Sequence, residues 1–236
     1  MTNMLLDSST KGLLACVGAL VAGGAYIANS QDYKEWIEVE TPGGLPPNIF
    51  GYCISWLATV SLRGDRKDIA FLRSKGDISF LRPEDIAVRQ YGEPQIAKWA
   101  VPHRQISQIA YDVDNEDEIQ TFFQRFIDKY PSCYRGISRI EKSIPALFLK
   151  IGKNDKEIIH KHVKDGSFHI FLSRSDAATV IEKGWGELHP NETSSLVASR
   201  GETDVMLYAT LKPEDYNVYE KIVDASIKFQ MARATK

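Results

Sequence analysis

Apolar and polar positions alternate in two short runs on either side of Asp165-Gly166. An Asp-Gly pair between two such runs strongly favours a β-hairpin, because glycine takes a positive φ without steric cost. With Asp165 and Gly166 as a two-residue turn, His162 would lie opposite His169. Side chains alternate between the two faces of a strand, so His160 would share a face with His162. The pattern therefore predicts three imidazoles on one face of a hairpin.

The other periodicities predict an α+β fold, in which a single mixed or antiparallel sheet is backed by helices. Residues 115–130 combine one apolar face with Asn115 as a cap, which is typical of an amphipathic helix. The remaining elements expected are helices at 177–183 and from Pro213 onward, a short helix near 83–85, a buried or membrane-surface helix at 49–62, and strands at 146–151 and 205–209.

The N-terminus carries an uncharged apolar segment, residues 12–28, between Lys11 and Asp32. Its length is at the short edge of what a membrane-spanning helix needs. We therefore expect residues 1–30 to form a single-pass membrane anchor, in the endoplasmic reticulum, and residues 31–236 to form the α+β domain. A cleaved signal peptide and a buried helix are the alternatives. The flanking charges are balanced, so the orientation is not predicted.

The composition of the chain limits its possible binding partners more than its possible chemistry. The chain of 236 residues has a net charge of -2 and no long basic run, which gives no electrostatic basis for binding nucleic acid. Its cysteines, Cys16, Cys53 and Cys133, have no spacing typical of a metal or redox site. A small-molecule substrate is the expected partner, and other biosynthetic enzymes are candidate partners.

Four of the five histidines, His160, His162, His169 and His189, lie close together in the sequence. Imidazole titrates near about pH 6.5, so such a cluster suits acid–base catalysis and the binding of an anion. The alternative is an iron, zinc or copper site with His160, His162 and His169 as ligands, and with either His189 or Glu157 as a fourth. The residue types alone leave both interpretations open.

Several strings of residues resemble the fungal luciferase family. The most specific is Gly-Trp-Gly-x-x-His-Pro at 184–190, because tryptophan is rare and the flanking glycines and His-Pro are an unusual combination. The similarity also covers these segments: 33–39, 165–169, 173–183, Tyr208-Ala209 and 218–227. It thus spans most of the chain.

Two segments depart from the family pattern. Asn191-Glu192-Thr193 stands where the family usually has Leu-Ala-Gly after His-Pro. Thr210-Leu211 stands where the family usually has Pro-Arg. These departures concern the luminous substrate more than the fold.

The resemblance implies an oxygenase-type enzyme. Luminous members of the family oxidise a hydroxylated styryl-pyrone with molecular oxygen, and no organic cofactor is implied. Triplet oxygen reacts slowly with organic molecules, so a cofactor-free enzyme must generate an electron-rich enolate. We expect one of His162 and His169 to be the general base and the other to orient or stabilise the anion, while His160 and His189 complete the catalytic patch.

Candidate substrate-binding residues lie on three further segments. Trp185 and Tyr208 are suited to stacking on a flat aromatic substrate. Arg104 is a candidate because residues 102–105 also resemble a stretch in some relatives. His103, in the same string, is expected to be structural or exposed.

The predicted function is that of a membrane-anchored luciferase-like enzyme of fungal secondary metabolism. It would act on a small aromatic or pyrone metabolite of polyketide type, with oxygen as co-substrate. Two alternatives stay open: a non-oxidative isomerase or cyclase that uses the same enolate chemistry, and a non-catalytic accessory protein that binds a small molecule.

Overall fold

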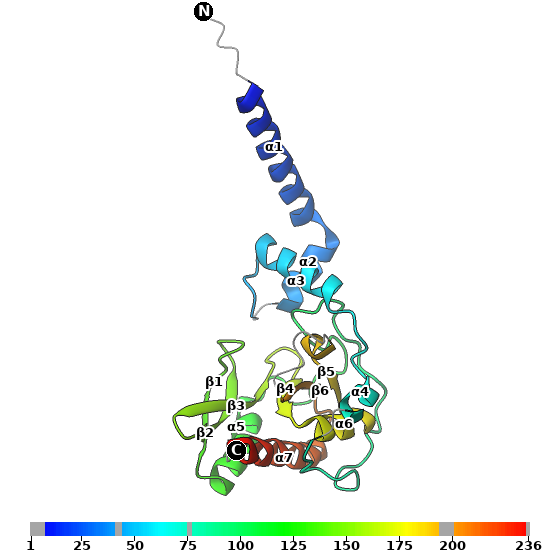
Figure 1. Ribbon diagram of the computed structural model, residues 1–236, viewed down its shortest axis with the longest axis vertical. Helices are drawn as coiled ribbons and strands as arrows, with labels where there is room; N and C mark the ends of the chain where they lie inside the picture. Colours follow the sequence, from blue (N-terminus) through cyan, green and yellow to red (C-terminus); the bar gives the residue numbers. More distant parts are fainter. Residues whose placement is uncertain (1–7, 41–43, 75–76, 194–200, 235–236) are drawn as a thin grey trace, which may run out of the picture.

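Six antiparallel strands form one sheet in the order β1-β2-β3-β4-β6-β5 (Figure 1). The strands are β1 (Cys133–Ile137), β2 (Pro145–Ile151), β3 (Asn154–Lys161), β4 (Phe168–Leu172), β5 (Gly186–Leu188) and β6 (Thr203–Leu207). The computed structural model describes residues 8–40, 44–74, 77–193 and 201–234, with side chains from Cys16 onward. The predicted α+β class with a single sheet is confirmed, and the sheet is antiparallel.

Three helices cover one face of this sheet: α5 (Glu116–Lys129), α6 (Arg174–Glu182) and α7 (Tyr216–Ala234). The α5 helix begins where its sequence predicts, because the Asn115 side chain accepts a hydrogen bond from the backbone N–H of Asp117. Ser173 caps α6 in the same manner, and Gly184 ends it with φ +77°. Pro213 opens a short 3₁₀ helix that leads into α7.

The sheet face beneath these helices is apolar. Phe168 and Ile170 of β4 and Val205 and Leu207 of β6 alternate along their strands and are completely buried. Phe168 meets Tyr219 of α7 edge-on, with ring centroids 5.3 Å apart. Burial of each such large side chain contributes roughly 1.5–3 kcal/mol, so this face supplies the main core.

The opposite face carries a long loop that the N-terminal helices hold in place. The helices α2 (Gln31–Glu40) and α3 (Ile49–Ser61) form a small second core around Trp36. The Trp36 Nε1 donates to the backbone carbonyl of Val101 at 3.0 Å, and Ser55 of α3 donates to the same carbonyl. These contacts fix the loop that follows Val101 above the sheet.

The first helix, α1 (Ser8–Asn29), precedes α2 and extends away from the remainder of the chain (Figure 1). Within the described part of the chain, no helix is long and apolar enough to cross a membrane. The predicted anchor at residues 12–28 is therefore not supported, because glycine and alanine, which make up much of this segment, add little apolar surface. In the predicted anchor, the side chains of residues 12–15 lie outside the described part of the structure.

The predicted hairpin is present, but its turn is longer than two residues. His160, rather than His162, pairs with His169. The shift in register is by two positions, so every side chain keeps its predicted face. Gly166 in the turn has φ +73°, and a Cβ built there would lie 2.2 Å from the Cβ of Ala110, so both conformation and space require glycine.

The elements not expected from the sequence include β1, β5 and the short helix α4 (Ile69–Ser74). The two strands lie at the sheet edges and are short, which leaves little alternation to recognise. The helix expected near residues 83–85 is instead a turn, in which the Asp85 carboxylate accepts the backbone N–H of Arg82 at 3.0 Å.

Candidate active site

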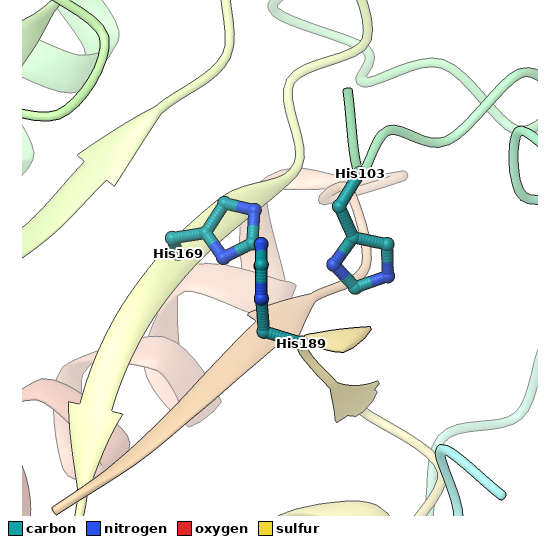
Figure 2. A group of neighbouring side chains, drawn as sticks. All are labelled: His103, His169 and His189. Carbon is teal, nitrogen blue, oxygen red and sulfur yellow. The ribbon is translucent and has the colours of Figure 1, made fainter. Parts of the chain in front are cut away.

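All five histidines of the chain lie together on the sheet face opposite α5, α6 and α7. His160 and His169 occupy paired positions of β3 and β4, His162 follows β3, His189 follows β5, and His103 lies on the overlying loop. Neighbouring ring centroids are 5.0–5.5 Å apart. Figure 2 shows His103, His169 and His189 directed toward one another. The structure therefore brings the four predicted histidines together and adds a fifth.

Carboxylates fix the tautomers of three rings. The contacts are His160 Nδ1 to Glu157 at 2.7 Å, His169 Nδ1 to Asp204 at 2.9 Å, and His103 Nε2 to Glu187 at 2.8 Å. An ionised carboxylate only accepts hydrogen bonds, so each of these nitrogens carries the hydrogen. The other nitrogen of each neutral ring keeps a lone pair, which can take a proton or bind a metal ion.

His162 lies between two acidic side chains. Its Nδ1 is 2.9 Å from the Ser167 hydroxyl, which contacts both carboxylate oxygens of Asp165 at 3.0 Å. Its Nε2 faces Glu141 Oε1 at 3.3 Å. Burial lowers the pKa of His162, but the hydrogen bonds and charges of Asp165 and Glu141 outweigh burial and hold this pKa above its ordinary value. These two acidic neighbours thus favour the protonated form of His162.

His189 presents a hydrogen-bond donor to its neighbours. Its Nδ1 accepts the backbone N–H of Asn191 at 3.1 Å, so the hydrogen of the neutral ring is on Nε2. Burial lowers the pKa of His189 to about 4, which keeps the ring neutral at physiological pH. Burial also lowers the pKa of His103 and of His160. Burial therefore favours the neutral form of these three rings, whereas the acidic neighbours of His162 favour its protonated form.

A cavity of about 190 Å³ opens on four of these rings, those of His103, His160, His169 and His189, whereas His162 does not line it. Its polar lining comes from His103, Glu141, His160, His169, His189, Asn191 and Asp204. Its apolar lining comes from Gly44, Val101, Pro102 and Ile140. A few polar groups that converge beside apolar surface are typical of a site for a small molecule.

The three residues expected to bind substrate lie outside this lining. Trp185 packs in the apolar core and donates its Nε1 hydrogen to a backbone carbonyl at 2.7 Å. Tyr208 is buried, and its hydroxyl donates to Glu187 at 3.2 Å. The Arg104 side chain is 2% exposed and donates to Glu141 at 2.6 Å. Tyr208 and Arg104 thus do not line the cavity but hold the carboxylates of Glu187 and Glu141 in position.

The sequence reasoning missed His103 and most of the carboxylates. Residues 102–105 show no periodicity typical of a helix or strand. The only available signal for His103 was therefore the resemblance of this segment to a stretch in some relatives. Strand alternation was the signal for Glu187, which lies two positions before His189 and so shares its face. Asp204 and Glu141 had no signal, since both reach the cluster through the long-range folding of the chain.

Comparison with known proteins finds similarity to luciferases in the segments that carry the histidines. A Luciferase domain model matches residues 155–226, which include four of the histidines. A luciferase of Neonothopanus nambi is 26% identical over 245 residues, covering 94% of this chain and 88% of that protein. Luciferases of Armillaria gallica and Armillaria mellea are 31% identical over 80 residues, covering 34% of this chain and 30% of each of those proteins. No solved structure matches the chain significantly.

The fold and the comparisons define the class of protein. A single antiparallel sheet buries a cluster of histidines and carboxylates beside a small cavity, in the segment that the domain model matches. The chain is similar to fungal luciferases over most of its length, which confirms the resemblance of its sequence motifs. At a coarse level, this similarity indicates a luciferase-related enzyme of oxygenase type.

Proposed function

We propose that this chain oxygenates a small aromatic or pyrone metabolite with molecular oxygen, by forming its enolate in the histidine-lined cavity. The observation that carries the proposal is the pair of Asp204 and His169, joined at 2.9 Å on the cavity wall. The names of the related luciferases support a reaction with oxygen. No organic cofactor is needed for a substrate that becomes an electron-rich enolate.

His169 is the proposed general base. Its Nδ1 hydrogen is held by Asp204, so Nε2 has the lone pair that takes a proton from a substrate hydroxyl. Burial raises the pKa of Asp204, but its electrostatic attraction to the nearby imidazoles and its hydrogen bond with His169 outweigh burial and hold this pKa well below the usual range. Asp204 therefore remains a carboxylate and stabilises the imidazolium that forms, as the acid does in a Ser-His-Asp triad.

His189 is the proposed donor to the enolate oxygen. Its Nε2 hydrogen is available because Nδ1 accepts the Asn191 N–H. The ring centroids of His189 and His169 are 5.2 Å apart, so one substrate oxygen can lie between them. A fixed donor in a site with little water stabilises developing negative charge more strongly than water does.

The apolar part of the lining supports a flat substrate. Val101, Pro102 and Ile140 lie beside the histidines and exclude water from the ring of a bound molecule. An enolate kept dry is protected from reprotonation by solvent. The enolate can then give up electrons to oxygen before its proton returns from His169.

Oxygen consumption by the full chain with candidate hydroxypyrones tests the proposal, with product masses measured in parallel. His169→Gln should lower kcat by about 10²–10⁴-fold, the usual contribution of a general base. Asp204→Asn should lower it less, because the ring remains in place. Ile170→Val, at the next position of β4 and directed to the other sheet face, is the matched control and should keep its kcat.

Three results would contradict the proposal. Unchanged turnover in His169→Gln would remove the assigned base. Turnover without oxygen consumption would indicate the isomerase or cyclase instead. Tight binding of a pyrone by wild type without any product would indicate the accessory binding protein.

A further inference from the structure

The geometry points to a binding site for one divalent transition-metal ion, held by Glu141, His160 and His162. The carboxylate oxygen and the two imidazole nitrogens that these residues offer all lie within 4.8 Å of one another. Glu141 comes from the loop between β1 and β2, and the two histidines come from the end of β3. The inference does not depend on the proposed oxygenation.

In the part of the chain that the structure describes, two of the three ligand atoms are buried without a hydrogen bond, and the Nε2 of His162 has only the 3.3 Å contact with Glu141 Oε1. The Nε2 atoms of His160 and His162 have no hydrogen-bond partner among the described residues, although the side chains are 1% and 0% exposed. A buried polar atom without a partner is costly and calls for an explanation, such as an ion. Glu141 and His160 line the cavity, which gives an ion a route to the site.

Both nitrogens are prepared to act as ligands. His160 donates its Nδ1 hydrogen to Glu157, so its Nε2 has the lone pair. The hydroxyl of Ser167 can donate its single hydrogen to Asp165, so it accepts the Nδ1 hydrogen of His162. Once the Nε2 proton of His162 leaves, that nitrogen also offers a lone pair, directed at Glu141.

The outer contacts have the pattern found around metal sites. Metal-binding histidines usually donate their second ring hydrogen to a carboxylate or similar acceptor, and metal-binding carboxylates are themselves hydrogen-bonded. Here Glu157 holds His160, Ser167 and Asp165 hold His162, and Arg104 donates to the other oxygen of Glu141 at 2.6 Å. Each of the three ligands is thus oriented by a second side chain.

A second group, His103, His169 and His189, also has ligand atoms within 4.8 Å of one another (Figure 2). His189 weakens it, because its Nδ1 already accepts the Asn191 N–H. Binding of a metal ion through Nδ1 would break that hydrogen bond. Binding through Nε2 would move the ring hydrogen to Nδ1, where it would point at the N–H of Asn191. This group also lacks a negative ligand. The geometry therefore favours Glu141, His160 and His162.

The donor set indicates the chemical class of the ion. Two imidazoles and one carboxylate suit iron(II), zinc, cobalt(II) or manganese(II), and they leave coordination positions open for water or another molecule. The His169 ring lies 5.0 Å from that of His162 and 5.4 Å from that of His160, centroid to centroid. The ion would thus lie beside the proposed base.

The test uses the full chain, stripped with a chelator and titrated with cobalt(II), whose visible absorption reports its ligands. One ion should bind per chain, zinc should displace it, and binding should raise the Tm. Loss of an outer contact costs about 10–100-fold in affinity, so Glu141→Gln and His160→Gln should each cost roughly 100-fold or more. His189→Gln is the matched control and should change the affinity less than about threefold.

Wild-type X-ray absorption keeps the proposal falsifiable if a variant fails to fold. A spectrum with two imidazoles and further light-atom ligands would support the assignment, and one with three imidazoles would overturn it. Retained binding in Glu141→Gln with loss in His189→Gln would overturn it as well, by placing the ion at the other group. Absence of specific cobalt(II) binding to wild type would end the proposal. None of these readouts requires a substrate, so a failed oxygenation assay leaves them unaffected.

Discussion

Phe168 and His169 are neighbours on β4, yet their side chains leave the sheet on opposite faces. Phe168 is completely buried against Tyr219 of α7, within the apolar core. His169 is 5% exposed and almost as buried, but it contacts His160, His162 and Asp204 instead. One strand thus serves two regions with the same degree of burial and opposite chemistry.

The comparison shows where the stability of the fold and the reactivity of the site are located. Burial of apolar side chains stabilises the folded state. A buried polar group loses its hydrogen bonds to water and must form hydrogen bonds within the protein instead. On the polar face the carboxylates achieve most of this replacement. His103 Nδ1, His160 Nε2 and His162 Nε2 still have no hydrogen-bond partner within the described ranges. Each such atom costs about 1–3 kcal/mol, so this face gives up stability where it can bind something.

The largest expected effect separates the two faces by stability. Phe168→Ala should lower the free energy of unfolding by about 3–5 kcal/mol, because it leaves a cavity in the apolar core. His169→Gln should cost less than about 2 kcal/mol, since an amide can keep a hydrogen bond to Asp204. Urea denaturation of both variants measures the difference. Equal losses would mean that the histidine cluster holds the fold together as much as the core does.

The hairpin shows how much local pattern could predict. Asp165-Gly166 correctly marked the turn, but the sequence could not show that the turn was longer, and the register was wrong by two positions. The faces were nevertheless right, because a shift of two keeps the alternation. The helix at Glu116–Lys129 was predicted almost to the residue, since its cap and its apolar face are both local signals.

The site could be predicted only where it lies on regular strands. His160, His162 and His169 belong to one hairpin, so their convergence follows from alternation. His103 and Glu141 come from loops whose positions depend on contacts far along the chain, such as that of Trp36 with Val101. Trp185 was predicted to stack on the substrate, although a tryptophan between two glycines is equally suited to fill a core.

A smaller effect on stability is expected from Glu40, a carboxyl group among the N-terminal helices that hold the loop over the polar face. Glu40 is completely buried at the end of α2, and its Oε1 accepts the N–H of Leu45 at 2.7 Å. Its other oxygen has no hydrogen-bond partner in the described part of the chain. Burial therefore raises the pKa of Glu40 to about 7 from 4.5, in contrast to the well-partnered Asp204.

This shift predicts a pH dependence of stability. Between about pH 4.5 and 7 the native state keeps the Glu40 proton that the unfolded chain loses, so stability falls as the pH rises through this range. Glu40→Gln does not titrate. The free energy of unfolding of the variant minus that of wild type should therefore rise by about 3 kcal/mol from about pH 4.5 to 8. A difference that stays flat across that range, in urea titrations at several pH values, would contradict the raised pKa.

The smallest expected effect on catalysis tests whether Trp185 belongs to the apolar face or to the site. Its ring is 3% exposed, meets Tyr219 edge-on at 6.1 Å, and donates to the carbonyl of Ala87. Trp185→Phe removes that hydrogen bond and part of the packing, so stability should fall by about 1–2 kcal/mol. KM for a pyrone substrate should change less than about twofold, because loss of a stacking contact costs about 0.5–1.5 kcal/mol and Trp185 makes none in the cavity. A tenfold rise in KM at unchanged stability would instead place this ring against the substrate and blur the division between the two faces.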